Sequence, residues 1–226
     1  MIALTRMRLS GFGRGGRALP PAIAVLVVLG VIYGGGASPA AIAYGYSAAA
    51  LFPVLAWLTK VLLDAEPDVQ RRLARVSVGP SGEALAGVLA ALVVSVIVCV
   101  LAMGAPWLFH GIDHTKSLGR GIVLGILAHL LAIPPAIALG ALSSRAVTRS
   151  IRTGVAVLAV ATVLVVVLGL QGSWAPWLVP PVMATARALN DPGVPPVGTL
   201  TLLVGWALAW CAVAFAGYGW LRRARS

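Results

Sequence analysis

Charged side chains are scarce in this chain of 226 residues. They make up 10% of the residues, only six of them are acidic, and 60% of the residues are hydrophobic. Because soluble domains carry about 25% charged residues, the composition excludes an ordinary soluble domain and indicates an integral membrane protein. The net charge of +11 does not point to nucleic acid, since the arginines lie in small groups between long apolar runs, as topology signals do.

Cysteines and catalytic motifs are sparse as well. Cys99 and Cys211 both lie inside apolar runs, which is typical of small buried residues and not of a redox pair. The chain has no phosphate-binding loop of the Walker type and no His-Glu-x-x-His motif. The run His110-Gly111-Ile112-Asp113-His114 contains three possible metal ligands, but Gly111 and the loop context favour a solvated loop. The sequence therefore predicts neither an enzyme nor a cofactor or metal site.

One short motif resembles a catalytic one. Gly79-Pro80-Ser81-Gly82 matches the GxSG of intramembrane serine proteases of the rhomboid type, and His129 could act as the base. Ser81 lies at one end of a predicted span, however, and His129 lies in the far half of the next, about 20 Å away in depth at 1.5 Å per residue. A nucleophile and its base have to lie within about 3 Å. Ser81 is instead expected to cap the helix that follows, with Glu83 in its first turn.

Long apolar runs divide the chain into six predicted transmembrane helices, each near the roughly 20 residues that cross a bilayer. They cover residues 18–33, 40–63, 84–103, 120–142, 154–170 and 198–221. Most of the basic residues fall on the side that holds both termini. The positive-inside rule therefore predicts a multi-pass plasma-membrane protein with both termini in the cytoplasm. Residues 1–226 form a single transmembrane domain, in which residues 1–17 are a basic interfacial N-terminus.

The predicted external loop, residues 171–197, is unusual because it is rich in proline and yet apolar. Trp174 and Trp177 are among its apolar residues, and a short helix is expected at about residues 181–190. Two interpretations stay open. The tryptophans could anchor a surface loop at the membrane interface, or the segment could re-enter the outer leaflet where protein or a water-filled cavity shields its backbone.

The densest run of charge, residues 64–79, lies between the second and third predicted spans and thus in the cytoplasm. Acidic residues at its start complement a helix dipole, and Gly79 with Pro80 ends the helix. Val69, Leu73 and Val76 recur at i, i+4 and i+7, which gives one apolar face. The pattern predicts a short amphipathic helix.

This arrangement of spans, basic N-terminus, charged helix and apolar loop resembles the ABC-2 type permeases of bacterial ABC exporters. The likeness to small actinobacterial members is closest in Phe52-Pro53-Val54-Leu55-Ala56-Trp57, continuing through Leu63-Asp64-Ala65-Glu66-Pro67 to Gln70-Arg71. The resemblance implies the transmembrane subunit of an ATP-driven exporter, a homodimer or heterodimer whose separate ATPase subunits hydrolyse ATP. It also implies that residues 66–78 are the coupling helix that docks on the ATPase. The residues expected to carry this docking are Glu66, Asp68, Val69, Arg71, Arg72, Leu73, Arg75 and Val76.

Polar side chains inside the predicted spans are candidates for a substrate pathway. Tyr46, Ser95 and His129 are the ones selected, and the absence of Asp, Glu or Arg in mid-span counts against a proton- or sodium-coupled carrier. By resemblance, residues 174–190 correspond to the external re-entrant region of the permeases. The alternative function is a non-transporting scaffold or accessory subunit of a membrane complex.

Overall fold

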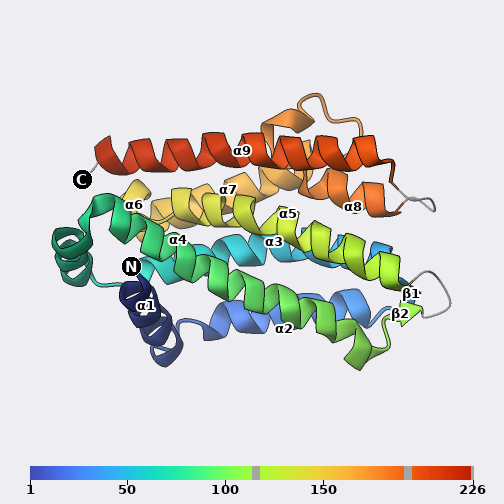
Figure 1. Cartoon of the computed structure of the whole chain (residues 1–226), viewed down its shortest axis with the longest axis horizontal. Helices are drawn as coiled ribbons and strands as arrows, with labels where there is room; N and C mark the ends of the chain where they lie inside the picture. Colours follow the sequence, from blue (N-terminus) through green and yellow to red (C-terminus); the bar gives the residue numbers. More distant parts are fainter. Residues whose placement is uncertain (114–117, 191–194, 225–226) are drawn as a thin grey trace.

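The computed structural model describes residues 1–113, 118–190 and 195–224 of the chain, and these are almost entirely helical (Figure 1). A two-residue parallel bridge pairs β1 (Ser38–Pro39) with β2 (Ile112–Asp113) at the end of the bundle opposite the termini. A 3₁₀ turn covers Pro176–Leu178. The helices are α1 (Ile2–Arg14), α2 (Leu19–Tyr33), α3 (Ala40–Asp64), α4 (Asp68–Phe109), α5 (Leu118–Leu142), α6 (Arg145–Thr148), α7 (Ile151–Leu168), α8 (Val182–Asn190) and α9 (Val197–Ala224).

Five helical stretches in the described part of the chain are long and apolar enough to cross a membrane, namely α3, α4, α5 with α6, α7 and α9. The first predicted span corresponds to α2, whose 15 residues reach only about 22 Å at 1.5 Å per residue. It counts as a sixth span only together with α1, from which it is bent by 77°. The all-helical class is confirmed, and the number of candidate spans is five or six.

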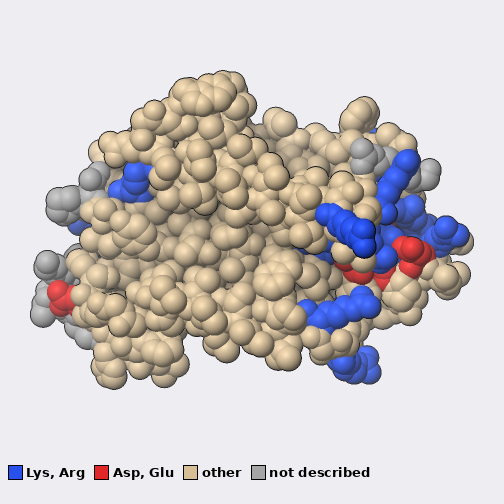
Figure 2. Space-filling model, turned by 180° about the vertical axis from the view of Figure 1, so that it is seen from behind, with Lys and Arg blue, Asp and Glu red and all other residues tan. Residues whose placement is uncertain are grey.

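Both chain termini lie at the same end of the bundle (Figure 1). Lys and Arg side chains gather at one end of the molecule with Asp and Glu among them, and few lie at the other end (Figure 2). This basic end contains α1, the start of α4, α6 and the end of α9. The basic segments of the chain thus lie together at one end of the bundle, as the sequence predicts.

Helix α3 is the centre of the fold, and α5 packs against it along most of its length. Glycines make this close packing possible. A Cβ on Gly121 would lie 2.5 Å from Cβ of Ala40, and one on Gly125 would lie 2.6 Å from Cβ of Tyr44. Small residues at such positions let two membrane helices approach closely.

Replacing Gly125 is therefore expected to force α3 and α5 apart. We expect Gly125→Ala to lower the free energy of unfolding by about 1–3 kcal/mol, the usual range for overpacking. Gly104→Ala is the matched control, because a Cβ on Gly104 in α4 meets open space. Thermal unfolding of the purified variants in detergent measures the difference, and equal midpoints would show that the α3–α5 packing is not tight.

One sequence prediction about α4 is confirmed and another needs correction. The charged helix and the third span are separate helices, as expected, and they meet at a kink at Gly79, where φ is 76° and ψ is 164°. Glycine alone adopts this conformation without strain, and the helix resumes at once because Pro80 suits a first helical position. Ser81 lies inside this helix and is not its cap. Residues 68–78 form a short helix, called the α4 arm below, joined to the spanning part without a linker.

Helix α8 confirms the short helix expected at about residues 181–190. Its Thr185, Ala186 and Leu189 are buried, and a Cβ on Gly45 of α3 would lie 3.3 Å from Cβ of Leu189. Trp174, which precedes α8, is 84% exposed. The segment is thus half packed and half exposed, and whether it re-enters a membrane stays a prediction.

Candidate functional site

The α4 arm turns its apolar face away from the protein. Val69, Leu73 and Val76 are 68%, 65% and 87% exposed, whereas Ala74 on the opposite side is buried. The apolar face that the sequence predicts is therefore real, and within the described residues no other element covers it. A contiguous exposed apolar face held on a helix is typical of a contact with a partner or a membrane surface.

The arm is anchored by a buried carboxylate, Glu83, at the start of the spanning part of α4. Arg8 of α1 donates to Glu83 at 2.5 Å and also to Glu66, Arg222 of α9 donates to Glu83, and Arg75 of the arm reaches Glu83 through Nε at 3.4 Å. These five side chains are called the Glu83 cluster. Charged hydrogen bonds of this kind are strong and short, so the cluster fastens α1, α9 and the arm to one point.

A second set of contacts fixes the base of the arm. The Lys60 ammonium donates to Asp64 at 2.6 Å, and the backbone N–H of Arg145 donates to the same carboxylate at 2.7 Å. The Arg145 guanidinium donates to the carbonyls of Asp64 and Glu66 at 3.1 Å and 3.3 Å, where it satisfies backbone acceptors at the end of α3. Hydrogen bonds from Arg145 of α6 thus fix the short connection between α3 and the arm.

The predicted docking residues fall into two groups. Glu66 is buried in its ion pair with Arg8, and Arg75 is directed at Glu83. Arg71, whose side chain is 13% exposed, pairs with Asp68. The remaining members lie on the accessible surface of the arm, namely Asp68, Val69, Arg72, Leu73 and Val76.

A cavity of about 330 Å³ lies between the arm and α6, and we call it the basic hollow. It is lined by five arginines and one acidic residue, namely Arg71, Arg72, Arg75, Arg145, Arg149 and Asp68. Guanidinium groups pair well with carboxylates and phosphates, so the hollow suits an acidic partner. The sequence did not identify Arg145 and Arg149 as site residues. Their positive charges indicated only which side of the membrane the loop lies on, and no local sequence pattern links them to the arm.

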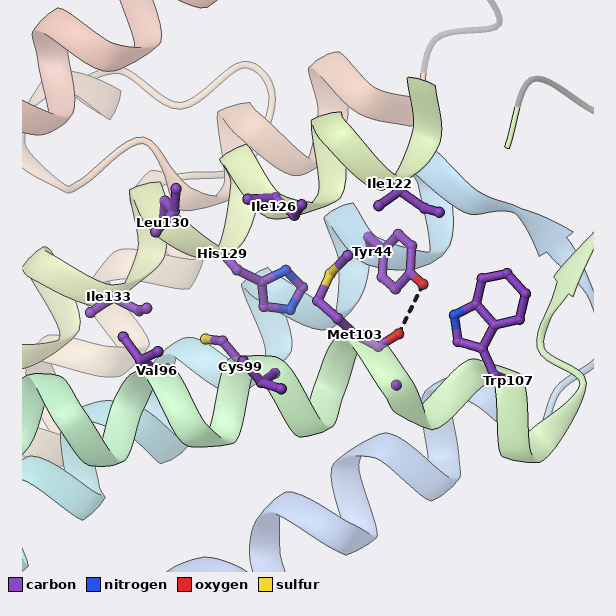
Figure 3. Close-up of a pocket in the computed structure, with 12 residues that line it drawn as sticks. Tyr44, Val96, Cys99, Met103, Trp107, Ile122, Ile126, His129, Leu130 and Ile133 are labelled. Atoms are coloured by element: carbon purple, nitrogen blue, oxygen red, sulfur yellow. Dashed lines mark hydrogen bonds between the residues drawn. The ribbon is translucent and has the colours of Figure 1, made fainter. Parts of the chain in front are cut away.

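A second cavity, of about 430 Å³, lies between α4 and α5 and is mostly apolar. His129 of α5 points into it opposite Cys99 and Met103 of α4, and the Tyr44 hydroxyl donates to the Met103 carbonyl at 2.9 Å (Figure 3). Nδ1 of His129 lies 2.8 Å from the Gly125 carbonyl. Because a carbonyl only accepts, Nδ1 carries the hydrogen and Nε2 is left as an acceptor.

The three predicted pathway residues do not meet in this cavity. His129 lines it, but Tyr46 is 48% exposed on α3 and Ser95 is fully buried, and neither is among the lining residues. The Ser95 hydroxyl has no hydrogen-bond partner among the described residues. Ser81 lines a different cavity, between α4 and α9.

The structure describes part of the possible metal site at residues 110–114. His110 ends α4, and Asp113 lies in β2; His114 falls outside the described residues. In the part of the chain that the structure describes, no three His, Cys, Asp or Glu side chains are grouped so that they could hold a metal ion.

Comparison with known proteins identifies no family. No protein-family model, no curated protein and no solved structure matches this chain. Its function is therefore inferred from the geometry of the arm, the basic hollow and the cavities.

Proposed function

We propose that the chain is the transmembrane subunit of an ATP-driven exporter of the ABC-2 type, and that the α4 arm docks on a separate ATPase subunit. One observation carries this function: a rigid helix outside the spanning part of α4 exposes Val69, Leu73 and Val76 while its other side is bonded into the bundle. The chain binds no ATP itself; the partner hydrolyses it, and the substrate crosses as the subunit alternates between conformations.

The side of the membrane follows from charge. The arm and both termini lie at one end of the bundle (Figure 1), and most of the arginines gather at one end of the molecule (Figure 2). Basic segments stay in the cytoplasm in multi-pass proteins. We therefore place the arm in the cytoplasm of a plasma-membrane protein, where an ATPase has access to it.

The contacts of the arm suit the transmission of movement. A push on the arm would act on α3 through Arg145, which contacts both Asp68 of the arm and Asp64 of α3. It would act on α1 and α9 through Arg75, which shares Glu83 with Arg8 and Arg222. On the partner, an apolar strip would cover Val69, Leu73 and Val76, and carboxylates would enter the basic hollow and fix the register. Within the membrane, the apolar α4–α5 cavity favours a lipid-like or amphipathic substrate.

Site-specific photo-crosslinking tests this assignment. A photoreactive residue at Val76, which is 87% exposed on the arm, is expected to form an adduct with a P-loop ATPase in membranes. The control is the same residue at Leu108, which is 79% exposed near the far end of α4 and is expected to form none. Adducts of Val76 with lipid alone would instead place the arm on the membrane surface, as in a scaffold subunit without an ATPase.

A further inference from the structure

The cavity between α4 and α5 combines one buried polar group with an open, apolar side. His129 lies near the middle of α5, and its side chain is directed across the cavity toward α4 (Figure 3). Val100 and Leu130, which also line the cavity, are 64% and 55% exposed. Both helices are long and apolar enough to cross a membrane. The cavity is therefore open toward the lipid, and an apolar chain can enter it from the side.

The walls of this cavity favour a neutral occupant. None of the described residues that line it is charged. A charged head group placed there would lose its water without gaining an opposite charge, which is costly. The same cost keeps the imidazole of His129 neutral, since this residue is only 2% exposed.

The hydrogen bonds of His129 determine what the occupant has to provide. Nδ1–H donates to the Gly125 carbonyl at 2.8 Å, so Nε2 can only accept. The Ser47 hydroxyl oxygen lies 3.3 Å from Nε2 and 3.1 Å from the Tyr44 carbonyl, and its one hydrogen serves one acceptor at a time. If a ligand donates to Nε2, the Ser47 hydrogen is available to the Tyr44 carbonyl and both acceptors are satisfied. The cavity thus suits a neutral ligand with a hydrogen-bond donor, and in lipids this group is a hydroxyl.

We propose that the α4–α5 cavity binds a neutral lipid with a free hydroxyl group, which donates to Nε2 of His129 while the apolar chain lies along Val100 and Leu130. The inference rests on the proposed function only where it makes this lipid the exported substrate. The hydroxyl of such a substrate has to pass the middle of the bilayer, where an unpaired polar group is costly, and His129 provides a partner there. Binding itself needs no ATPase.

Photo-labelling of the protein in phosphatidylcholine vesicles tests the hydroxyl requirement, because the phosphatidylcholine head group has no hydrogen-bond donor. The probe is hexadecanol with a diazirine in its chain, and mass spectrometry of the intact protein gives the labelled fraction. Unlabelled hexadecanol is expected to compete at about fivefold lower concentration than hexadecyl methyl ether, an effect of about one hydrogen bond. Equal competition by the alcohol and the ether would overturn the proposal and leave an ordinary lipid-facing groove.

Substitutions at His129 test the acceptor. His129→Phe is expected to remove the preference for the alcohol over the ether, whereas His129→Gln keeps an acceptor oxygen and is expected to retain most of it. Ser95→Ala is the matched control, because Ser95 is a buried polar residue of α4 outside the cavity lining, and it is expected to change nothing. If His129→Phe still prefers the alcohol as the unmodified protein does, His129 is not the partner of the hydroxyl and the proposal is wrong.

A second pair of variants tests the place of binding. A Cβ on Gly104, which lines the cavity, meets open space, and so does one on Gly205 of α9, which does not line it. Gly104→Leu is expected to abolish labelling of α4 and α5 in peptide maps, and Gly205→Leu is not; the reverse result would contradict the site. Recovery of an ATPase without any preference for the alcohol would refute the lipid site alone. A preference for the alcohol without an ATPase would refute the proposed function and leave the lipid site standing.

Discussion

Glu83→Gln is expected to lower the free energy of unfolding by about 3–5 kcal/mol, because removing one partner of a buried ion pair leaves the other charge uncompensated. The Glu83 side chain is 3% exposed and is shared by Arg8, Arg75 and Arg222. Arg8 keeps Glu66 as a partner in the variant, whereas Arg222, whose side chain is 9% exposed, loses its carboxylate. Thermal unfolding in detergent, followed by tryptophan fluorescence, gives the size of the loss.

Two further variants show whether burial causes this loss. Asp68→Asn also removes a carboxylate from an arginine, but the Asp68 side chain is 60% exposed, and exposed pairs contribute about 0–1 kcal/mol. Adding Arg222→Gln to Glu83→Gln removes the uncompensated charge and is expected to restore part of the stability. If Glu83→Gln is no more destabilising than Asp68→Asn, the cluster does not hold the basic end together.

Reversing Arg71 and Arg72 together to Glu is expected to reduce the amount of ATPase recovered with the protein about tenfold or more, since charge reversal places like charges against the partner. Both residues line the basic hollow. Insertion into the membrane is expected to be unaffected, because the arm lies outside the spanning part of α4. Quantitative mass spectrometry of the purified complex measures the ratio of ATPase to this chain.

The matched control reverses Arg6 and Arg14, which makes the same change in net charge. Both arginines are exposed on α1 at the basic end, and neither lines the basic hollow. This double variant is expected to recover nearly as much ATPase as the unmodified protein. An equal loss in both double variants would show that the overall positive field, and not the arm, attracts the partner.

Local patterns in the sequence predicted the local structure well. The apolar spacing of Val69, Leu73 and Val76 predicted one face of a helix, and that face exists in the arm. The stop at Gly79 was also correct, but its φ of 76° could not be predicted, because glycine permits many conformations there. The sequence therefore did not reveal that the helix resumes directly at Pro80.

The sequence did not predict which residues far apart along the chain contact one another. Arg8 and Arg222 lie 75 and 139 positions from Glu83, and neither periodicity nor spacing pairs residues so far apart. Glu83 was expected only to complement a helix dipole, and Glu66 was expected at the docking surface. Both expectations follow from local position, whereas the actual partner of each carboxylate depends on how α1, α4 and α9 pack at the basic end.

The number of helices that can cross a membrane was also not predictable from local composition. Residues 18–33 have the composition of a transmembrane helix, yet α2 is too short to cross alone. The bend of 77° from α1 follows a stretch in which Gly16 has a positive φ of 66°, which glycine allows without strain. Composition alone does not show where a helix breaks.

The most direct measurement of the central claim is the composition of the complex that the tagged protein forms in mild detergent. Transport driven by a docked ATPase predicts that a P-loop ATPase is recovered in equimolar amount with the chain, and that reversing Arg71 and Arg72 removes it. The proposed function would be contradicted if the folded protein were extracted from the membrane without an ATPase in every detergent that keeps it intact.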